Sequence, residues 1–83
     1  MNKESIQERI EINPTLLSGK PVVRGTRIPV SLVLNLLGNG YTTQRIVDAY
    51  PELVFEDIVA ALRFAERLTN YEEEVVVPGF SAV

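Results

Sequence analysis

The stretch GKPVVRGTRIPV, residues 19–30, decides the fold of this chain, because it combines turn-forming, β-branched and basic residues within twelve positions. It holds three of the eight basic residues, two of the five glycines, two of the five prolines and no acid. Val22-Val23 and Arg27-Ile28 bracket Gly25-Thr26, and glycine at the first central position suits a two-residue type II′ turn. The stretch therefore predicts a tight β-hairpin that leads directly into a helix.

Arg24 and Arg27 face each other across the end of this predicted hairpin. Like charges in facing positions destabilise a hairpin unless a negative group lies between them, so the pair indicates an anion site. Three interpretations stay open: contact with phosphate or nucleic acid, pairing with carboxylates of the acidic half or of a second subunit, and exposure without consequence. The predicted nucleic-acid or anion-binding residues are Lys20, Arg24, Gly25, Thr26, Arg27 and Arg45.

Charge is distributed unevenly along the chain, whose formal net charge is −3. Residues 12–47 carry four basic side chains and no acid, whereas residues 48–83 carry eight acids against two arginines. This polarity predicts one surface that faces an anion and a second surface with a different task.

Size and composition predict one small, oligomeric domain. A chain of 83 residues forms a single domain, here residues 1–83, and a domain of this size buries a marginal core. Yet 46% of the residues are apolar, so we expect a homo-oligomer, with a dimer as the simplest form. The first residues lack the apolar core of a signal peptide, and no apolar run approaches the ~20 residues of a membrane span. We therefore expect a soluble, cytoplasmic protein with no membrane partner.

Enzyme chemistry is disfavoured by the residues that are missing. The chain has no cysteine and no histidine, which excludes thiol nucleophiles, imidazole bases and the usual zinc sites. Ser18-Gly19-Lys20 is followed by Pro21, so the phosphate-binding motif GxxxxGK[ST] is absent. We expect a protein that is not an enzyme, with no catalytic residues, no metal and no cofactor.

Apolar periodicity predicts a short strand and three helices. Residues 8–12 alternate polar and apolar, and Asn13-Pro14 ends them. Residues 30–37 form one apolar helical stripe that Gly38-Asn39-Gly40 ends. Thr42 or Thr43 caps a second helix that stops before Pro51. A third helix covers about residues 55–68, with an inward stripe of Ile58, Ala61, Leu62, Ala65 and Leu68 or Thr69.

The predicted fold class is α+β and mainly α. A β element with its hairpin covers residues 8–29, a trihelical helix-turn-helix-like core of winged-helix or homeodomain-like type covers 30–69, and a tail or strand covers 70–83. Residues 75–77 are three valines, which favour an edge strand paired with the strand near Ile10 or with another chain, although a docking segment is the alternative. The predicted partner-binding residues are Tyr71, Glu72, Glu73, Glu74, Val75, Val76, Val77 and Phe80.

The run from Ile10 to Ala65 resembles a family of small bacterial and archaeal proteins known as domain of unknown function 433. The resemblance rests on residues 12–14, 18–30, 40–41, 46, 50–51, 53, 56–58 and 60–62. It implies a helix-turn-helix-like fold, dimerisation and, for members of VapB antitoxin type, a C-terminal segment that binds a PIN-like ribonuclease toxin. One position departs from the pattern: Val54 stands where the family commonly has the Thr or Ser that caps the third helix, a loss of about 0.5–2 kcal/mol.

The third helix is a poor candidate for reading DNA bases. Its N-terminal end carries Glu52, Glu56 and Asp57, and carboxylates there repel phosphates. We therefore expect any DNA contact to be made by the hairpin, and we assign no role to Arg63 or Arg67. The predicted function is an antitoxin-like DNA-binding protein of a type II toxin-antitoxin system that represses its own operon and neutralises a PIN-type ribonuclease. The alternative is a dimeric protein-interaction module whose helix-turn-helix scaffold does not bind DNA.

Overall fold

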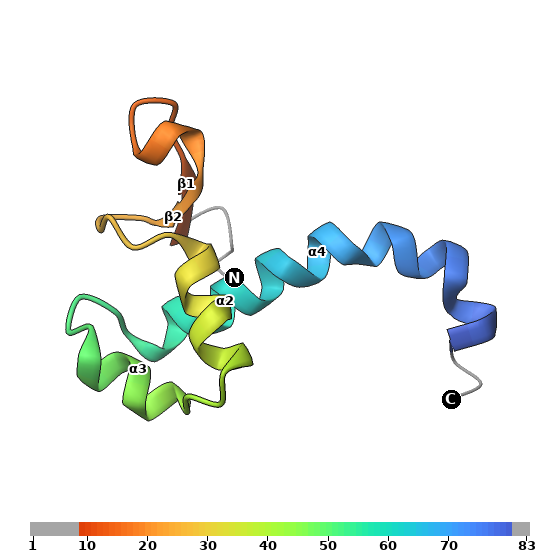
Figure 1. Ribbon diagram of the computed structural model, residues 1–83. Helices are drawn as coiled ribbons and strands as arrows, with labels where there is room; N and C mark the ends of the chain where they lie inside the picture. The colour runs from red at the N-terminus through yellow and green to blue at the C-terminus, as the bar shows by residue number, and fades with distance from the viewer. Residues whose placement is uncertain (1–8, 81–83) are drawn as a thin grey trace, which may run out of the picture.

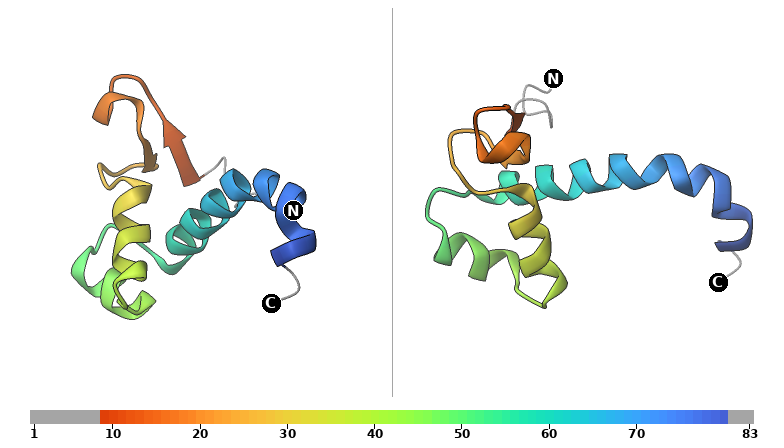
Figure 2. Two further views of the ribbon diagram at one scale, coloured as in Figure 1. Left: turned by 45° about the vertical axis from the view of Figure 1, so that its right-hand side comes forward. Right: turned by 45° about the horizontal axis from the view of Figure 1, so that its top comes forward.

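A two-stranded sheet and three helices form the body of the protein, and the last helix extends well beyond that body (Figures 1 and 2). The computed structural model describes the backbone of residues 9–80 and the side chains of residues 9–70. The elements in chain order are β1 (Ile10–Ile12), η1 (Leu17–Gly19), β2 (Pro21–Val23), α2 (Val30–Gly38), α3 (Thr43–Ala49) and α4 (Phe55–Phe80). The predicted α+β, mainly α class is confirmed. Within the described residues, no helix has both the length and the apolar character needed to span a membrane.

The sheet pairs β2 with β1 rather than with the segment that follows the turn at residues 24–27. The two strands are antiparallel, with Ile10 opposite Val23 and Ile12 opposite Pro21. The predicted second hairpin arm is reduced to a single bridge between Val22 and Pro29. Proline cannot donate a backbone hydrogen bond, so Pro29 ends this arm where a strand would otherwise continue.

The hydrophobic core lies between this sheet and one face of each helix. Its largest fully buried side chains come from β2 and from all three α-helices: Val22 and Val23 from β2, Val30 and Val33 from α2, Ile46 from α3 and Ile58 from α4. The contacting helices and strands therefore share one core, as expected of a single small domain.

The predicted helix boundaries in the middle of the chain are confirmed. The α2 helix ends at Gly38, and Gly40 takes a φ of 93°, a conformation that glycine adopts without steric cost. Thr42 caps α3, because its side-chain oxygen accepts a hydrogen bond of 3.1 Å from the Arg45 amide. The short connection holds α2 and α3 against the same core.

The α4 helix is longer than predicted, and the strand expected at residues 75–77 is wrong. Helix α4 runs without interruption from Phe55 to Phe80. No glycine or proline interrupts residues 55–77, and valine lowers helix propensity by less than about 0.7 kcal/mol per residue, so the backbone ladder continues through the three valines. Pro78 has no amide hydrogen to donate, and the helix axis bends in this last part (Figure 1).

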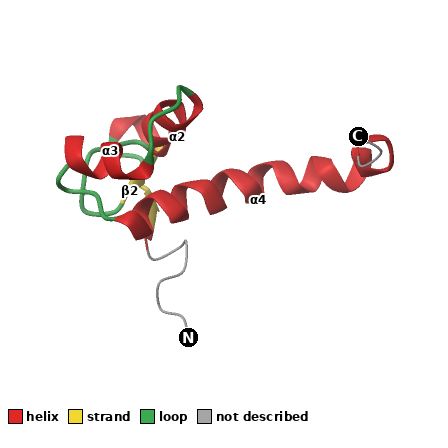
Figure 3. Ribbon diagram, turned by 90° about the horizontal axis from the view of Figure 1, so that it is seen from below, coloured by secondary structure: helices red, strands yellow, loops and turns green. Residues whose placement is uncertain are grey.

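The predicted inward stripe of α4 is buried only where the body covers it. Ile58 and Ala61 are fully buried, whereas Leu62 is 47% and Leu68 is 66% exposed. The later part of α4 extends away from the other elements, as the view from below shows (Figure 3). Leu62 lies on the side of the helix that turns away from the core.

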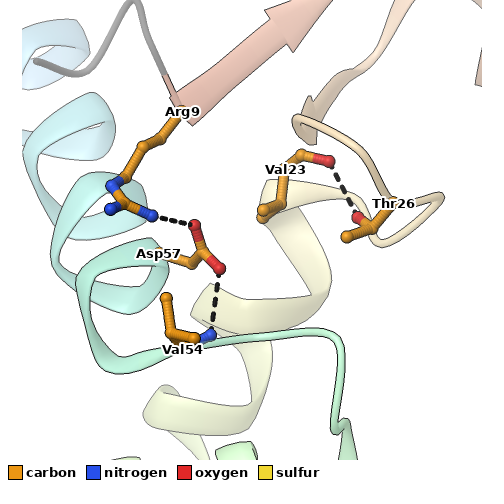
Figure 4. A network of polar contacts seen from close by, with 5 residues as sticks. All are labelled: Arg9, Val23, Thr26, Val54 and Asp57. Carbon is orange, nitrogen blue, oxygen red and sulfur yellow. Dashed lines mark hydrogen bonds and ion pairs between the residues drawn. The ribbon is translucent and has the colours of Figure 1, made fainter. Parts of the chain in front are cut away.

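Asp57 supplies the N-terminal cap of α4 that the valine side chain at position 54 cannot provide. One carboxylate oxygen of Asp57, Oδ2, accepts a hydrogen bond of 3.0 Å from the Val54 amide, so the third residue of the helix reaches back to its N-cap. The other oxygen, Oδ1, lies 2.9 Å from Nη1 of Arg9 (Figure 4). Asp57 is the buried acid among the described residues, and this pair joins the start of β1 to the start of α4.

We expect Asp57→Ala to lower the free energy of unfolding by about 2–4 kcal/mol, because it removes a cap and leaves the largely buried Arg9 guanidinium without this carboxylate. Urea denaturation followed by circular dichroism measures the change. Asp48→Ala is the control, since Asp48 is an exposed acid whose bond to Gln44 contributes only a few tenths of a kcal/mol. Equal effects of the two substitutions would contradict the assigned role of Asp57.

Candidate nucleic-acid interface

The basic turn is a compact loop of residues 24–27 that two side-chain hydrogen bonds of Thr26 hold in shape. The Thr26 amide donates to the Val23 carbonyl at 3.0 Å, and the Thr26 hydroxyl donates to the same oxygen at 2.8 Å. The Thr26 hydroxyl oxygen in turn accepts from the Ile28 amide at 2.9 Å. The Thr26 side chain thus binds the Val23 carbonyl and the Ile28 amide, which would bind each other in a regular hairpin; Figure 4 shows its bond to Val23.

The turn type differs from the predicted one. The bond from Thr26 to Val23 makes Arg24 and Gly25 the central residues, not Gly25 and Thr26. Gly25 has a φ of 84°, which is the requirement at the third position of a type II turn. The predicted type II′ turn is therefore wrong, because the Thr26 side chain favours a turn one residue earlier.

The turn carries both of its arginines on the surface. Arg24 and Arg27 are exposed, as is Gly25 between them. The Val23 amide donates to the Ile28 carbonyl at 3.0 Å, so Arg24 and Arg27 are the first and last residues of the loop that this bond closes. Two cations therefore share one small exposed loop, which is the arrangement that suits an anion shared between them.

The turn is also tied to β1. The Arg24 amide donates a short hydrogen bond of 2.7 Å to the Arg9 carbonyl. Because the Arg9 side chain pairs with Asp57, a single residue links the basic turn to the N-terminus of α4. This link limits the positions that the turn can take relative to the helices.

Lys20 and Arg45 lie apart from the turn. Lys20 precedes β2 and Arg24 follows it, so their Cα atoms are about 13 Å apart at 3.3 Å per residue. Arg45 belongs to α3, where its guanidinium carbon lies 4.2 Å from the centre of the Tyr41 ring. Both cations are exposed. The structure thus places four of the predicted residues, 24–27, on one loop, whereas Lys20 lies at the other end of β2 and Arg45 belongs to α3.

Acidic groups occupy the N-terminal end of α4, as predicted. Glu52 and Glu56 are exposed, whereas Asp57 is 7% exposed and turned towards Arg9. The exposed carboxylates keep this end of the helix unfavourable for phosphate. In a trihelical helix-turn-helix this end would enter the major groove, so the geometry leaves the basic turn as the surface suited to an anion.

The predicted partner-binding residues, Tyr71 to Val77 and Phe80, lie in the last part of α4. Their side chains fall outside the described part of the protein, so the prediction stays a prediction for these residues. Among the described side chains, no three of the His, Cys, Asp or Glu type gather in a way that would hold a metal ion.

Sequence reasoning missed the pair of Arg9 and Asp57. The cap that Asp57 forms could have been predicted, because an acid three residues after the N-cap position has the spacing of a capping box, and Val54 and Asp57 have that spacing. The ion pair with Arg9 could not, because 48 residues separate Asp57 from Arg9 and no local pattern connects them.

The fold and the site define a small helix-turn-helix-like α+β protein with an exposed basic turn. The chain belongs to the family described as Protein of unknown function (DUF433), whose family model matches residues 10–65. The resemblance drawn from residues 10–65 is thus confirmed at the level of the family.

The chain is similar to two known proteins. The chain is 40% identical over 60 residues to Uncharacterized protein y4eO of Sinorhizobium fredii (strain NBRC 101917 / NGR234), a match over 72% of this chain and 27% of that protein. The chain therefore spans about a quarter of the length of this curated relative. A crystal structure of a DUF433 member protein from Anabaena variabilis ATCC 29413 superimposes with a TM-score of 0.71 at 28% identity, over 87% of this chain and 71% of the other.

We expect Gly25→Ala to lower the free energy of unfolding by about 1–2 kcal/mol, because a side chain disfavours the positive φ of this turn. The effect is conformational, since a Cβ at Gly25 would meet no atom within 4 Å. Gly38→Ala is the matched control: it also meets no atom within 4 Å, lies at the end of α2 and needs no positive φ. Urea denaturation of both variants should show a loss only for Gly25→Ala, and equal stability of the two would argue against the turn.

Proposed function

We propose that this protein is an antitoxin-like, non-enzymatic DNA-binding protein that grips phosphates with the basic turn, residues 24–27. The observation that carries the proposal is the exposure of Arg24 and Arg27 on one loop whose backbone is held by Thr26 and by the Arg9 carbonyl. A braced loop loses little conformational freedom when it binds, so two arginines on it bind an anion with a smaller entropic cost than two free side chains.

The binding mode follows from the charges of the helices. The acidic start of α4 keeps this helix away from the duplex, so the turn meets the phosphate backbone or the minor groove rather than major-groove bases. Contacts of this kind position a protein on DNA and make its affinity strongly dependent on salt.

The antitoxin half of the proposal rests on α4. The helix continues to Phe80, and its last part lies away from the sheet and the other helices (Figure 3). Leu68, in the second half of α4, is 66% exposed. A projecting helix with apolar residues is suited to insertion into a groove of a partner, here a PIN-type ribonuclease.

DNA binding is tested by fluorescence anisotropy with DNA from the upstream region of the gene, titrated over salt. We expect wild type to bind with a steep negative salt slope, and Arg24→Ala/Arg27→Ala to bind at least about tenfold more weakly with about two units less slope, one for each lost phosphate contact.

The control for this experiment is Lys20→Ala/Arg45→Ala, which removes the same charge outside the turn. We expect it to retain most of the affinity, because only longer-range attraction is lost. Equal losses in the two double variants would show that general charge, not the turn, attracts DNA. Absence of binding at low salt would reject the DNA-binding half of the proposal.

Toxin neutralisation is tested by co-expression with a PIN-type ribonuclease encoded beside the gene. We expect full-length protein to restore growth and a variant that ends at residue 70 to fail, although both bind upstream DNA equally. Rescue by the shortened protein would place the toxin contact elsewhere, and a gene without such a neighbour would argue against the antitoxin assignment.

One observation favours the second candidate function, a protein-interaction module. The matching segment is only 27% of the S. fredii relative, so a similar domain forms part of a longer chain there. In this alternative the turn arginines bind carboxylates of a partner, and the anisotropy experiment above shows no DNA affinity.

A further inference from the structure

The first half of α4 presents an apolar ridge on its outer side. Phe55, Val59 and Leu62 are 56%, 36% and 47% exposed, and their spacing of four and three residues aligns them along the helix. At 100° per residue Phe55, Val59 and Leu62 lie about 120°, 160° and 100° around the helix from Ala61, so the ridge lies on a different side of α4 from the one that holds Ala61 in the core. Large side chains exposed together in a row are typical of an interaction surface.

Charges flank the ridge in a pattern with opposite signs at its two ends. Glu56 lies at the N-terminal end and Arg63 two turns later on the same flank, and both are exposed. Glu52 precedes Glu56 at the acidic end, and Arg67 follows Arg63 at the basic end. A helix with this pattern is complementary to its own copy in the antiparallel orientation and repels its copy in the parallel one.

We propose that this face of α4 binds α4 of a second copy, antiparallel, about a two-fold axis that passes beside Val59. A two-fold axis makes the contact self-complementary, so each copy contributes the same ridge. The two ridges cover each other, and Glu56 of each copy lies next to Arg63 of the other. Arg63 pairs with Glu66 of its own chain at 3.1 Å, and both side chains are exposed, so exchange of this partner costs little.

The inference does not depend on the proposed function, because it uses no residue of the basic turn and no part of α4 beyond Arg67. It also accounts for the large exposed side chains of a domain whose small size limits its core.

The ridge is tested by measuring the dimer dissociation constant with analytical ultracentrifugation. Leu62→Glu places two carboxylates at the contact, and we expect it to raise the dissociation constant at least about 100-fold. Far-ultraviolet circular dichroism confirms that this exposed substitution leaves the fold intact. If the wild-type protein is still a monomer at a concentration of about 100 µM, the contact is too weak to be a specific dimer interface, and the proposal is overturned.

The antiparallel orientation is tested by exchanging charges. We expect Glu56→Arg and Arg63→Glu each to weaken the dimer about tenfold, because like charges then meet twice across the two-fold axis. The double variant restores opposite charges, and we expect its dissociation constant to return to within about threefold of wild type. Additive losses in the double variant would reject this pairing.

Cysteine crosslinking gives a second, independent measurement, since the chain has no cysteine of its own. Val59→Cys places one thiol beside the two-fold axis in each copy, and helices 8–10 Å apart bring such thiols within disulfide reach. Leu68→Cys is the control, an exposed position on a different side of α4. Rapid crosslinking of Val59→Cys alone supports the proposal, and equal crosslinking of both variants, or of neither, overturns it.

Discussion

The carboxylate of Asp57 holds together the parts of this protein that lie far apart in sequence. Its two oxygens bind the Val54 amide and the Arg9 guanidinium, so one side chain starts the longest helix and fixes the first strand to it. The Arg9 carbonyl then accepts the Arg24 amide, which places the basic turn. Loss of one acid would thus loosen a helix end, a strand and a candidate binding loop together.

Local patterns predicted most of the helical body. Apolar spacing located α2, α3 and the start of α4, and glycine and threonine marked the ends between them, because these signals act over a few residues. The sheet was predicted less well. Pairing of β1 with β2 depends on contacts across residues 13–20, and Val75 to Val77 follow the helix before them instead of their own β propensity.

The candidate site shows the same division. The sequence predicted that Arg24 and Arg27 share one turn rich in glycine and charge, but it left open whether they are exposed or paired with carboxylates. The distance of Lys20 and Arg45 from that turn depends on the direction of β2 and on the position of α3, which charge counts along a chain do not report. Closeness in sequence therefore predicted which basic residues share a loop within the turn, but it did not predict the positions of basic residues outside the turn.

The acidic residues at the start of α4 bear on both proposed surfaces, the basic turn and the apolar ridge of α4. A helix-turn-helix that reads bases needs this end free of negative charge, so Glu52 and Glu56 are costly there if α4 enters the major groove. The same charges are favourable if α4 instead packs against an antiparallel copy, where Arg63 and Arg67 lie opposite. The helix that usually binds DNA would then join the subunits, and the basic turns of the two copies would carry the anion contacts. On these two proposals charge separates the two tasks: the acidic half would assemble the protein, and the basic half would meet its ligand.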